Sequence, residues 1–205
     1  MKSQVFTNHP NSGELATIGW QNKLSALWGI QEGYKNAADK LVASAIRASK
    51  KNNVRVLDTY IFPVMFLYRH SVEINLKLIC LRFEGTLPKG NHDLLVLWDH
   101  VFNEIVDRTK SEEFRTVVKT YKKNFKIWST DGIELNKLRN FIVDVQKIDR
   151  ESDVWRYLLD KDGSLYFEKT RIIEYPEIRK NFHEILNILD YIYDAVDDYL
   201  SGDPT

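Results

Sequence analysis

Four ionisable side chains lie in one of the most apolar stretches of the chain, FPVMFLYRHSVEINLKLICL at residues 62–81. Arg69, Glu73 and Lys77 share one face of a helix because they are spaced at intervals of four, and His70 lies beside Glu73 at a spacing of three. Arginine and lysine bind phosphate, and a carboxylate can orient an imidazole that exchanges protons near neutral pH. A helix that is apolar on most sides is buried on most sides. These four side chains, the polar stripe, must therefore line a cleft, face a partner or pair with one another.

A further candidate, His92, lies in the segment NHDLL at residues 91–95. Asn91 is typical of a helix N-cap and Asp93 of an acidic first turn, so His92 is predicted in the first turn of a new helix. Its ring either caps or packs locally, or forms a hydrogen bond with Glu73 and extends the polar stripe. The candidate catalytic residues are then Arg69, His70, Glu73, Lys77 and His92.

Hydrophobic periodicity predicts an all-α protein, a helical bundle with one small β-hairpin near residues 154–168. Gly29 and Gly33 are expected to divide the first helix, and Pro63 is expected near the start of the next one, which Gly85 ends. In the hairpin, two apolar-aromatic runs flank a turn rich in aspartate and glycine. The predicted helices cover approximately residues 20–51, 63–84, 91–108, 111–128, 133–150 and 177–200.

The composition is that of a globular protein of 205 residues with a formal net charge of zero. This balance argues against a purely electrostatic nucleic-acid binder, which usually has a basic excess. Cys80 is the only cysteine, which excludes an intrachain disulfide and a cysteine zinc cluster and fits a reducing cytoplasm.

We expect a flexible or extended N-terminal arm at residues 1–17, without the apolar core of a secretory signal, followed by a single domain at residues 18–205. The charges within residues 62–81 argue against a membrane-spanning helix.

Two segments resemble the core of HEPN-type proteins, which are helical bundles of bacterial toxin–antitoxin modules and phage-defence systems. FPVMFLYRHSVEINLKLI followed by NHDLLVLW is similar to the family's arginine before an E-x-x-L-K helix, a loop and HDL. IDRESDVWRYLLDKDGSLYF is similar to D-x-x-S-x-x-x-R-Y-P-x-D-x-x-G, with Leu158 in place of the usual proline. The resemblance covers roughly residues 55–170. It implies an all-α bundle, and many HEPN proteins are dimers that cut RNA without metal through an R-x(4-6)-H motif at the dimer interface.

The R-x(4-6)-H motif is not intact in this chain. Arg139 is followed by Asn140, the polar residue that the family favours, but Asp144 stands where the first permitted histidine would be. Arg179 and His183 have only three residues between them and lie on the last predicted helix. An aspartate does not donate a proton at neutral pH unless burial raises its pKa strongly. Arg139, Asn140 and Asp144 are therefore a degenerate motif, and the sequence leaves open whether the chain is an enzyme.

Two further segments combine basic and aromatic residues. Arg156 and Tyr157 are predicted on an extended part of the hairpin, where they either pack on the bundle or bind a base or phosphate of the substrate. KTYKKNFK at residues 119–126 is typical either of a single-strand binding surface or of the wet face of an amphipathic helix. The sequence contains no phosphate-binding glycine loop, zinc-protease motif or Cys/His ligand spacing, so neither a cofactor nor a metal is predicted.

Two functions are open at this point. The first is an HEPN-like RNA-directed effector of a bacterial defence or toxin–antitoxin system, as a metal-independent endoribonuclease. In it, Arg69 and Lys77 bind phosphate, His70 or His92 transfers protons, and Glu73 orients an imidazole. The second is a non-catalytic HEPN-like dimerising subunit or adaptor that binds nucleic acid, nucleotide or a protein partner. For either function, we expect a homodimer in the cytoplasm. Its candidate partners are RNA and an antitoxin or defence-system protein, and no membrane partner is expected.

Overall fold

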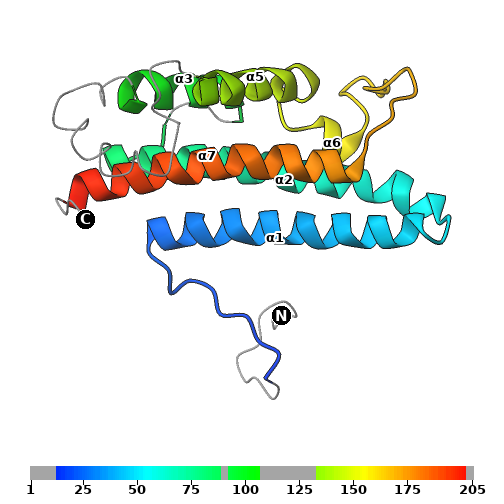
Figure 1. The fold of residues 1–205 in the computed structure, drawn as a ribbon, viewed down its shortest axis with the longest axis horizontal. Helices are drawn as coiled ribbons and strands as arrows, with labels where there is room; N and C mark the ends of the chain where they lie inside the picture. The colour runs from blue at the N-terminus through cyan, green and yellow to red at the C-terminus, as the bar shows by residue number, and fades with distance from the viewer. Residues whose placement is uncertain (1–12, 89–91, 107–132, 202–205) are drawn as a thin grey trace.

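Every named element is a helix in the part of the chain that the computed structural model describes, residues 13–88, 92–106 and 133–201. The elements are α1 (Lys23–Ser49), α2 (Val54–Glu84), α3 (Leu94–His100), the π-helix η1 (Val101–Val106), α5 (Ile133–Ile148), α6 (Val154–Tyr157) and α7 (Tyr175–Ser201). In Figure 1, α1 lies along one side of α2 and α7, and α3 and α5 lie on the other side. The all-α bundle predicted from the sequence is confirmed.

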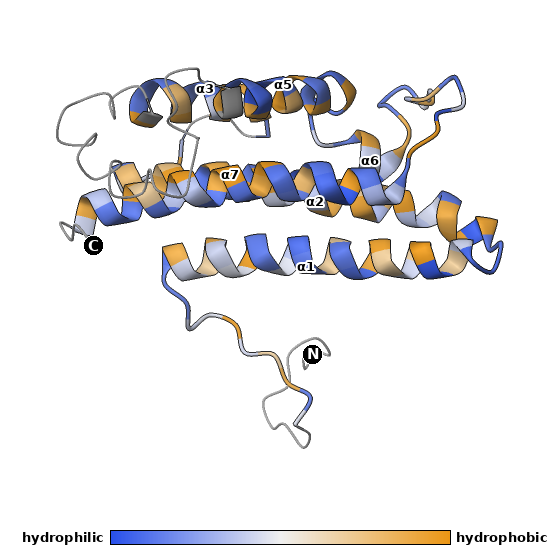
Figure 2. Ribbon diagram, viewed as in Figure 1, coloured by the Kyte–Doolittle hydropathy of each residue, from blue (hydrophilic) through white to orange (hydrophobic). Residues whose placement is uncertain are grey.

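The core forms around α2, which contacts α1, α3, η1, α6 and α7. Residues 71–76 of α2 are all buried, as expected of a helix with apolar residues on nearly every side. Apolar and polar residues are interspersed along α7 in Figure 2, and nearly all of the buried residues of that helix are apolar. Arg69 is among the largest fully buried side chains, which also include Trp98, Tyr68, Phe182, Leu76 and Ile79.

α1 and α2 continue through residues that were expected to interrupt them. α1 is one helix across Gly29 and Gly33, so the predicted division is wrong. α2 begins at Val54, where the side chain of Asn53 caps it, and Pro63 lies inside the helix rather than near its start. A glycine costs a helix about 1 kcal/mol and an interior proline about 3 kcal/mol. The packing of α1 against α2 along their length outweighs both local costs.

Gly85 ends α2 in the left-handed conformation, with a φ of +74°, as the sequence predicted. Gly85→Ala is expected to lower the free energy of unfolding by about 1 kcal/mol, because a side chain is strained in this conformation even where space is free. Gly29→Ala is the matched control: the added Cβ also meets open space, but the position is helical. It is expected to raise the free energy of unfolding by about 0.5–1 kcal/mol. Urea denaturation measures both changes, and effects of the same sign would contradict this account.

α3 is capped differently from the prediction. The Oδ1 atom of Asp93 accepts hydrogen bonds from two backbone N–H groups of the first turn, at 3.1 and 3.0 Å, so Asp93 is the N-cap. The predictions that Asn91 caps this helix and that Asp93 lies inside its first turn are wrong, because the carboxylate of Asp93 satisfies N–H groups that the helix cannot pair itself. His92 therefore lies just before α3 rather than within it.

The β-hairpin predicted near residues 154–168 is not confirmed, because no named strand lies within these residues. Its first half is the short helix α6, so the extended conformation expected for Arg156 and Tyr157 is wrong. An isolated antiparallel bridge between Leu159 and Leu165 is all the β-structure in this segment. The helix buries its first two residues, Val154 and Trp155. In a strand, these adjacent side chains would point to opposite faces.

Residues 13–21 have neither helix nor strand, in keeping with the arm expected over residues 1–17. Residues 1–12 lie outside the described residues, and so do the helix predicted at residues 111–128 and its basic–aromatic segment at 119–126. Among the described helices, none combines the length and the apolar character that crossing a membrane requires.

Candidate functional site

Arg69 of α2 is completely buried, and each of its three guanidinium nitrogens has a partner. Nη1 donates to Oε2 of Glu73 at 2.9 Å, and Nη2 donates to the backbone oxygen of His92 at 2.7 Å. Nε donates to the backbone oxygen of Asp149 at 3.2 Å and lies 3.3 Å from its Oδ2. Arg69 therefore joins α2 to the residues before α3 and to the connection between α5 and α6.

Glu73 lies one turn further along α2 and is also completely buried. Its Oε1 accepts from Nζ of Lys77 at 2.7 Å and lies 2.9 Å from Nδ1 of His92. Burial raises the pKa of Glu73, but the hydrogen bond from Lys77 and the charges of Lys77 and Arg69 outweigh burial, so the pKa lies below its ordinary value. Glu73 is thus an ionised carboxylate at neutral pH. Of the two roles left open for His92, the structure has the one in which its ring contacts Glu73.

Asp149 completes this group of side chains from the far side of Arg69 and is buried as well. Its Oδ1 accepts from the backbone N–H of Val154 at 3.1 Å, at the start of α6. Burial raises the pKa of Asp149, and the nearby charge of Arg69 opposes this rise only in part. Asp149 was not among the predicted site residues, although it is the first residue of the D-x-x-S pattern. The ion cluster, as we call it, consists of Arg69, Glu73, Lys77, His92 and Asp149.

The ion cluster reaches solvent at one edge. The side chain of His92 is 50% exposed and that of Lys77 is 18% exposed, whereas Arg69 and Glu73 are sealed. Because Nδ1 of His92 faces Glu73, the ring is held in one orientation and Nε2 is the ring nitrogen left for a ligand. At this edge, the imidazole of His92 and the ammonium group of Lys77 both contact the buried carboxylate of Glu73.

The phosphate-binding role expected for Arg69 does not fit this geometry. The side chain has no exposed surface, and its nitrogens are already bound within the protein. Two of the three alternatives for the polar stripe therefore apply, to different residues. Internal pairing describes Arg69 and Glu73, and an open site describes Lys77 together with His92.

His70 is turned away from the ion cluster toward aromatic rings. Its ring stacks on Phe66 with the centroids 5.5 Å apart, and the Tyr34 ring lies at 5.0 Å. Nδ1 is 3.8 Å from Oε2 of Glu73, which is too far for a hydrogen bond. Burial lowers the pKa of His70, although the charge of Glu73 acts in the opposite direction. His70 is therefore neutral at neutral pH and is poorly placed to donate a proton.

The degenerate motif is not brought to the ion cluster. Arg139, Asn140 and Asp144 are exposed on α5. Asp144 lies 3.2 Å from Lys147 in an ion pair between two largely exposed side chains. The contribution from this part of the chain to the ion cluster comes instead from Asp149, just beyond the end of α5.

Arg156 and Tyr157, the predicted substrate-binding residues, lie on α6 and outside the ion cluster. Arg156 donates to the backbone oxygen of Ser152 and, at 2.6 Å, to Oδ1 of Asp153. Its guanidinium carbon lies 5.2 Å from the ring centroid of Tyr157 and 5.9 Å from that of Phe66. These distances are within the range of cation–π contacts. The guanidinium of Arg156 thus lies over the exposed ring of Tyr157.

His183, the other histidine considered for the motif, belongs to a second polar group. Oδ1 of Asp39 accepts from the Tyr68 hydroxyl at 2.6 Å and lies 2.7 Å from Nε2 of His183. Burial and the contact with Asp39 raise the pKa of Tyr68. These residues come from α1, α2 and α7, so no local spacing in the sequence predicts their contact.

Comparisons of the chain with protein-family models, with curated proteins and with solved structures find no match. Within the described residues, no group of three or more His, Cys, Asp or Glu side chains is placed to hold a metal ion.

Proposed function

We propose that the chain is an HEPN-like RNA-directed effector of a bacterial defence or toxin–antitoxin system, acting in the cytoplasm, and that it cuts RNA without a metal ion at the edge of the ion cluster. The observation that carries this proposal is the pairing of the half-exposed imidazole of His92 with the buried carboxylate of Glu73 at 2.9 Å. A carboxylate that fixes one ring nitrogen leaves the other to exchange protons with a substrate. Lys77 supplies a cation at the same place.

In the proposed reaction, a ribose 2′-oxygen attacks the adjacent phosphorus, and the bond from phosphorus to the 5′-oxygen breaks. Nε2 of His92 takes the proton of the 2′-hydroxyl as general base, and Glu73 stabilises the imidazolium that forms. Lys77 stabilises the negative charge that develops on the phosphorane oxygens. The departing 5′-oxygen takes a proton from water, and His92 returns its proton to solvent. The products are a 2′,3′-cyclic phosphate and a 5′-hydroxyl end.

Incubation of the purified protein with single-stranded RNA in the presence of EDTA tests this proposal. Cleavage products that carry a 2′,3′-cyclic phosphate are expected, because the attacking group is the neighbouring 2′-oxygen. A matched RNA with 2′-O-methyl groups should remain intact. Cleavage that requires added Mg²⁺, or that proceeds in the methylated RNA, would contradict the proposed mechanism.

A second candidate function is a non-catalytic HEPN-like subunit or adaptor that binds nucleic acid, nucleotide or a defence-system partner such as an antitoxin. Two observations favour it: Arg69 and Glu73 are sealed in the interior, and Arg139 and Asp144 lie apart on an exposed helix face. This function predicts binding without turnover in the same assay. The absence of cleavage in any RNA, together with retained RNA or protein binding, would select it over the ribonuclease.

Either function is proposed to operate as a homodimer, and an apolar surface near the start of the described chain supports this. Leu15, Ile18 and Trp20 are exposed in the segment before α1, and Trp28 and Ile30 are exposed in its first turns. Figure 2 shows apolar residues recurring along this segment, which extends away from the bundle. Clustered exposed apolar side chains mark interaction surfaces more often than isolated ones do.

The area of this surface suits a second copy of the chain. A covered tryptophan buries about 150–250 Å². With Trp20 71% and Trp28 58% exposed, the two present on the order of 200–300 Å². A standard interface buries about 800 Å² on each partner, somewhat more than half of it apolar. Together with the three aliphatic side chains, the tryptophans supply much of that apolar share.

Trp20→Ser combined with Trp28→Ser is expected to convert a dimer into a monomer, because the two largest apolar contacts are lost. Sedimentation equilibrium of the full chain measures this at micromolar concentrations. Val96→Ser combined with Ile148→Ser is the matched control, since both side chains are exposed and belong to α3 and α5, which lie on the other side of α2 from α1 (Figure 1). A monomeric wild-type protein, or equal dissociation of the control, would contradict the proposed interface.

A further inference from the structure

The chain after α6 is held in a defined shape although it contains no named strand. The backbone N–H of Tyr166 donates to the oxygen of Leu158 at 3.2 Å. Oδ1 of Asp160 accepts from two backbone N–H groups of the turn, at 2.9 and 2.8 Å. The ring of Phe167 lies 5.4 Å from that of Trp155, which is buried. These contacts anchor the segment on the bundle and give its exposed side chains a fixed arrangement.

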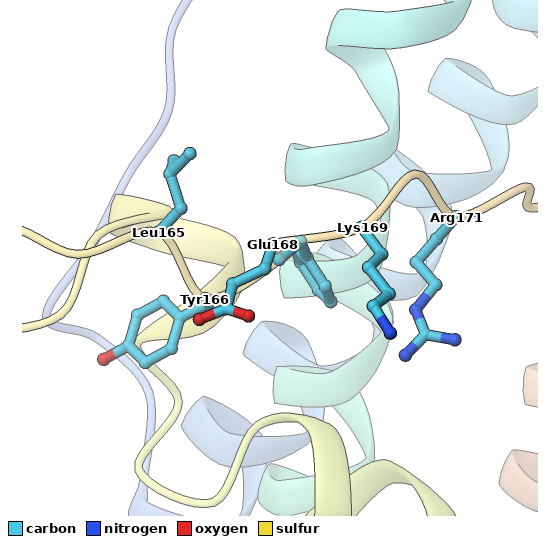
Figure 3. A pocket seen from close by; sticks show the side chains of 6 residues that line it. Leu165, Tyr166, Glu168, Lys169 and Arg171 are labelled. Carbon is cyan, nitrogen blue, oxygen red and sulfur yellow. The ribbon is translucent and has the colours of Figure 1, made fainter.

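This segment lines a hollow of about 310 Å³ (Figure 3). In Figure 3, Lys169 and Arg171 project to the same side of the backbone, and Tyr166 lies toward the other end with Glu168 between them. Ligand sites in proteins span about 300–1,000 Å³, so the hollow suits a small unit such as a single nucleotide. The residues that line it are Leu165, Tyr166, Phe167, Glu168, Lys169 and Arg171.

A second exposed aromatic side chain, Tyr157, comes just before Leu158, whose backbone contacts the segment that lines this hollow. Tyr157 is 62% exposed and Tyr166 is 39% exposed, and the hydrogen bond between Tyr166 and Leu158 brings their chain segments together. The guanidinium of Arg156 lies 5.2 Å from the Tyr157 ring and is itself held by Asp153. The surface therefore combines two tyrosine rings with three cationic side chains. We call Arg156, Tyr157, Tyr166, Lys169 and Arg171 the aromatic–basic platform.

We propose that the aromatic–basic platform binds single-stranded RNA, which deepens the proposed function and rests on it. Bases stack on exposed aromatic rings irrespective of sequence, and cations beside the rings attract the phosphates between the bases. Arg156 is largely neutralised by Asp153 and supports the ring, so Lys169 and Arg171 are the phosphate contacts. The carboxylate of Glu168 repels a phosphate in the hollow but accepts hydrogen bonds from a base amino group. The occupant of the hollow is thus a base, with its phosphate toward Lys169 and Arg171.

Duplex RNA does not fit this site, because its bases are stacked on one another and their faces are unavailable to the tyrosines. Binding that depends on the two rings should therefore be specific for single strands. Binding that depended on charge alone would not distinguish single from double strands. This difference separates the proposed site from a general attraction of basic side chains for phosphate.

Fluorescence anisotropy with a labelled 2′-O-methyl RNA of about 12 nucleotides tests the proposal. This probe lacks the nucleophile for cleavage, so it measures binding alone. Tyr157→Ala combined with Tyr166→Ala is expected to raise Kd about 10-fold or more, and Lys169→Glu combined with Arg171→Glu should weaken binding and reduce its salt dependence. Lys40→Glu combined with Arg47→Glu is the matched control, because it makes the same charge change on the exposed face of α1.

The proposal is overturned if the wild-type protein does not bind the probe, if the tyrosine variant binds within about two-fold of wild type, or if duplex RNA binds equally well. It is also overturned if the charge control weakens binding as much as the platform variant does. Cleavage of RNA with a KM unaffected by the tyrosine substitutions would refute the platform and leave the ribonuclease proposal in place. Ring-dependent binding of the probe without cleavage of ordinary RNA would refute the ribonuclease and leave the platform in place.

Discussion

Arg69→Met is expected to lower the free energy of unfolding by about 3–5 kcal/mol. The substitution removes the charge that compensates Asp149 and one of the two charges that compensate Glu73, and both carboxylates are completely buried. It also leaves the backbone oxygen of His92 without its donor, which adds the cost of an unpaired polar group. Native domains are stable by only about 5–15 kcal/mol, so this single change removes a large share of the total.

Urea denaturation at neutral pH, followed by tryptophan fluorescence, measures this loss. Arg139→Met is the matched control because Arg139 is exposed on α5, and its effect should stay within about 0.5 kcal/mol. Adding Asp149→Asn to Arg69→Met should recover part of the loss, because the carboxylate of Asp149 is buried and forms its ion pair with Arg69. A loss below about 1 kcal/mol for Arg69→Met alone would show that the ion cluster does not hold these segments together.

His92→Ala is expected to reduce the rate of RNA cleavage by about 10²–10⁴-fold, the usual contribution of a general acid–base residue. The loss should lie in kcat with little change in KM, because the proton transfer occurs only in the transition state. The fold should tolerate the substitution: the ring is 50% exposed, and Arg69 contacts the backbone oxygen of His92 rather than its ring. Single-turnover cleavage of a short labelled RNA measures the rate directly.

His183→Ala is the matched control for this experiment. His183 also faces a carboxylate, that of Asp39, and its side chain is 36% exposed. Its ring lies in a separate polar group with Tyr68, so cleavage by His183→Ala should match the wild-type rate. An unchanged rate in His92→Ala, or equal losses in both variants, would move the active centre away from the ion cluster.

The two predictions separate the roles of the ion cluster. Arg69 is a positioning residue, because it touches Glu73 and the backbone of His92 but has no surface for a substrate. His92 is the residue proposed to touch the substrate. Arg69→Met should therefore affect stability first and cleavage only through the position of His92, whereas His92→Ala should affect cleavage and leave stability nearly unchanged.

The sequence by itself determined the features that depend on near neighbours in the chain. The spacing of Arg69, Glu73 and Lys77 placed them on one face of a helix, and the structure has them in contact. The left-handed end of α2 at Gly85 and the apolar face of α7 were predicted for the same reason. The start of the helix at α3 was also predicted from local residues, although the predicted N-cap, Asn91, lies two positions before the observed one, Asp93.

Only the tertiary structure decided whether the polar stripe is open or closed. Asp149 is eighty residues away from Arg69 in the chain, yet its carboxylate and backbone oxygen cover the guanidinium. Long-range packing likewise carried α1 through two glycines and α2 through Pro63, and it formed α6 where an apolar-aromatic run suggested a strand. Periodicity shows which side chains share a face. What covers that face depends on segments far away in the sequence, and this is why Arg69 is sealed while His92 and Lys77 remain within reach of solvent.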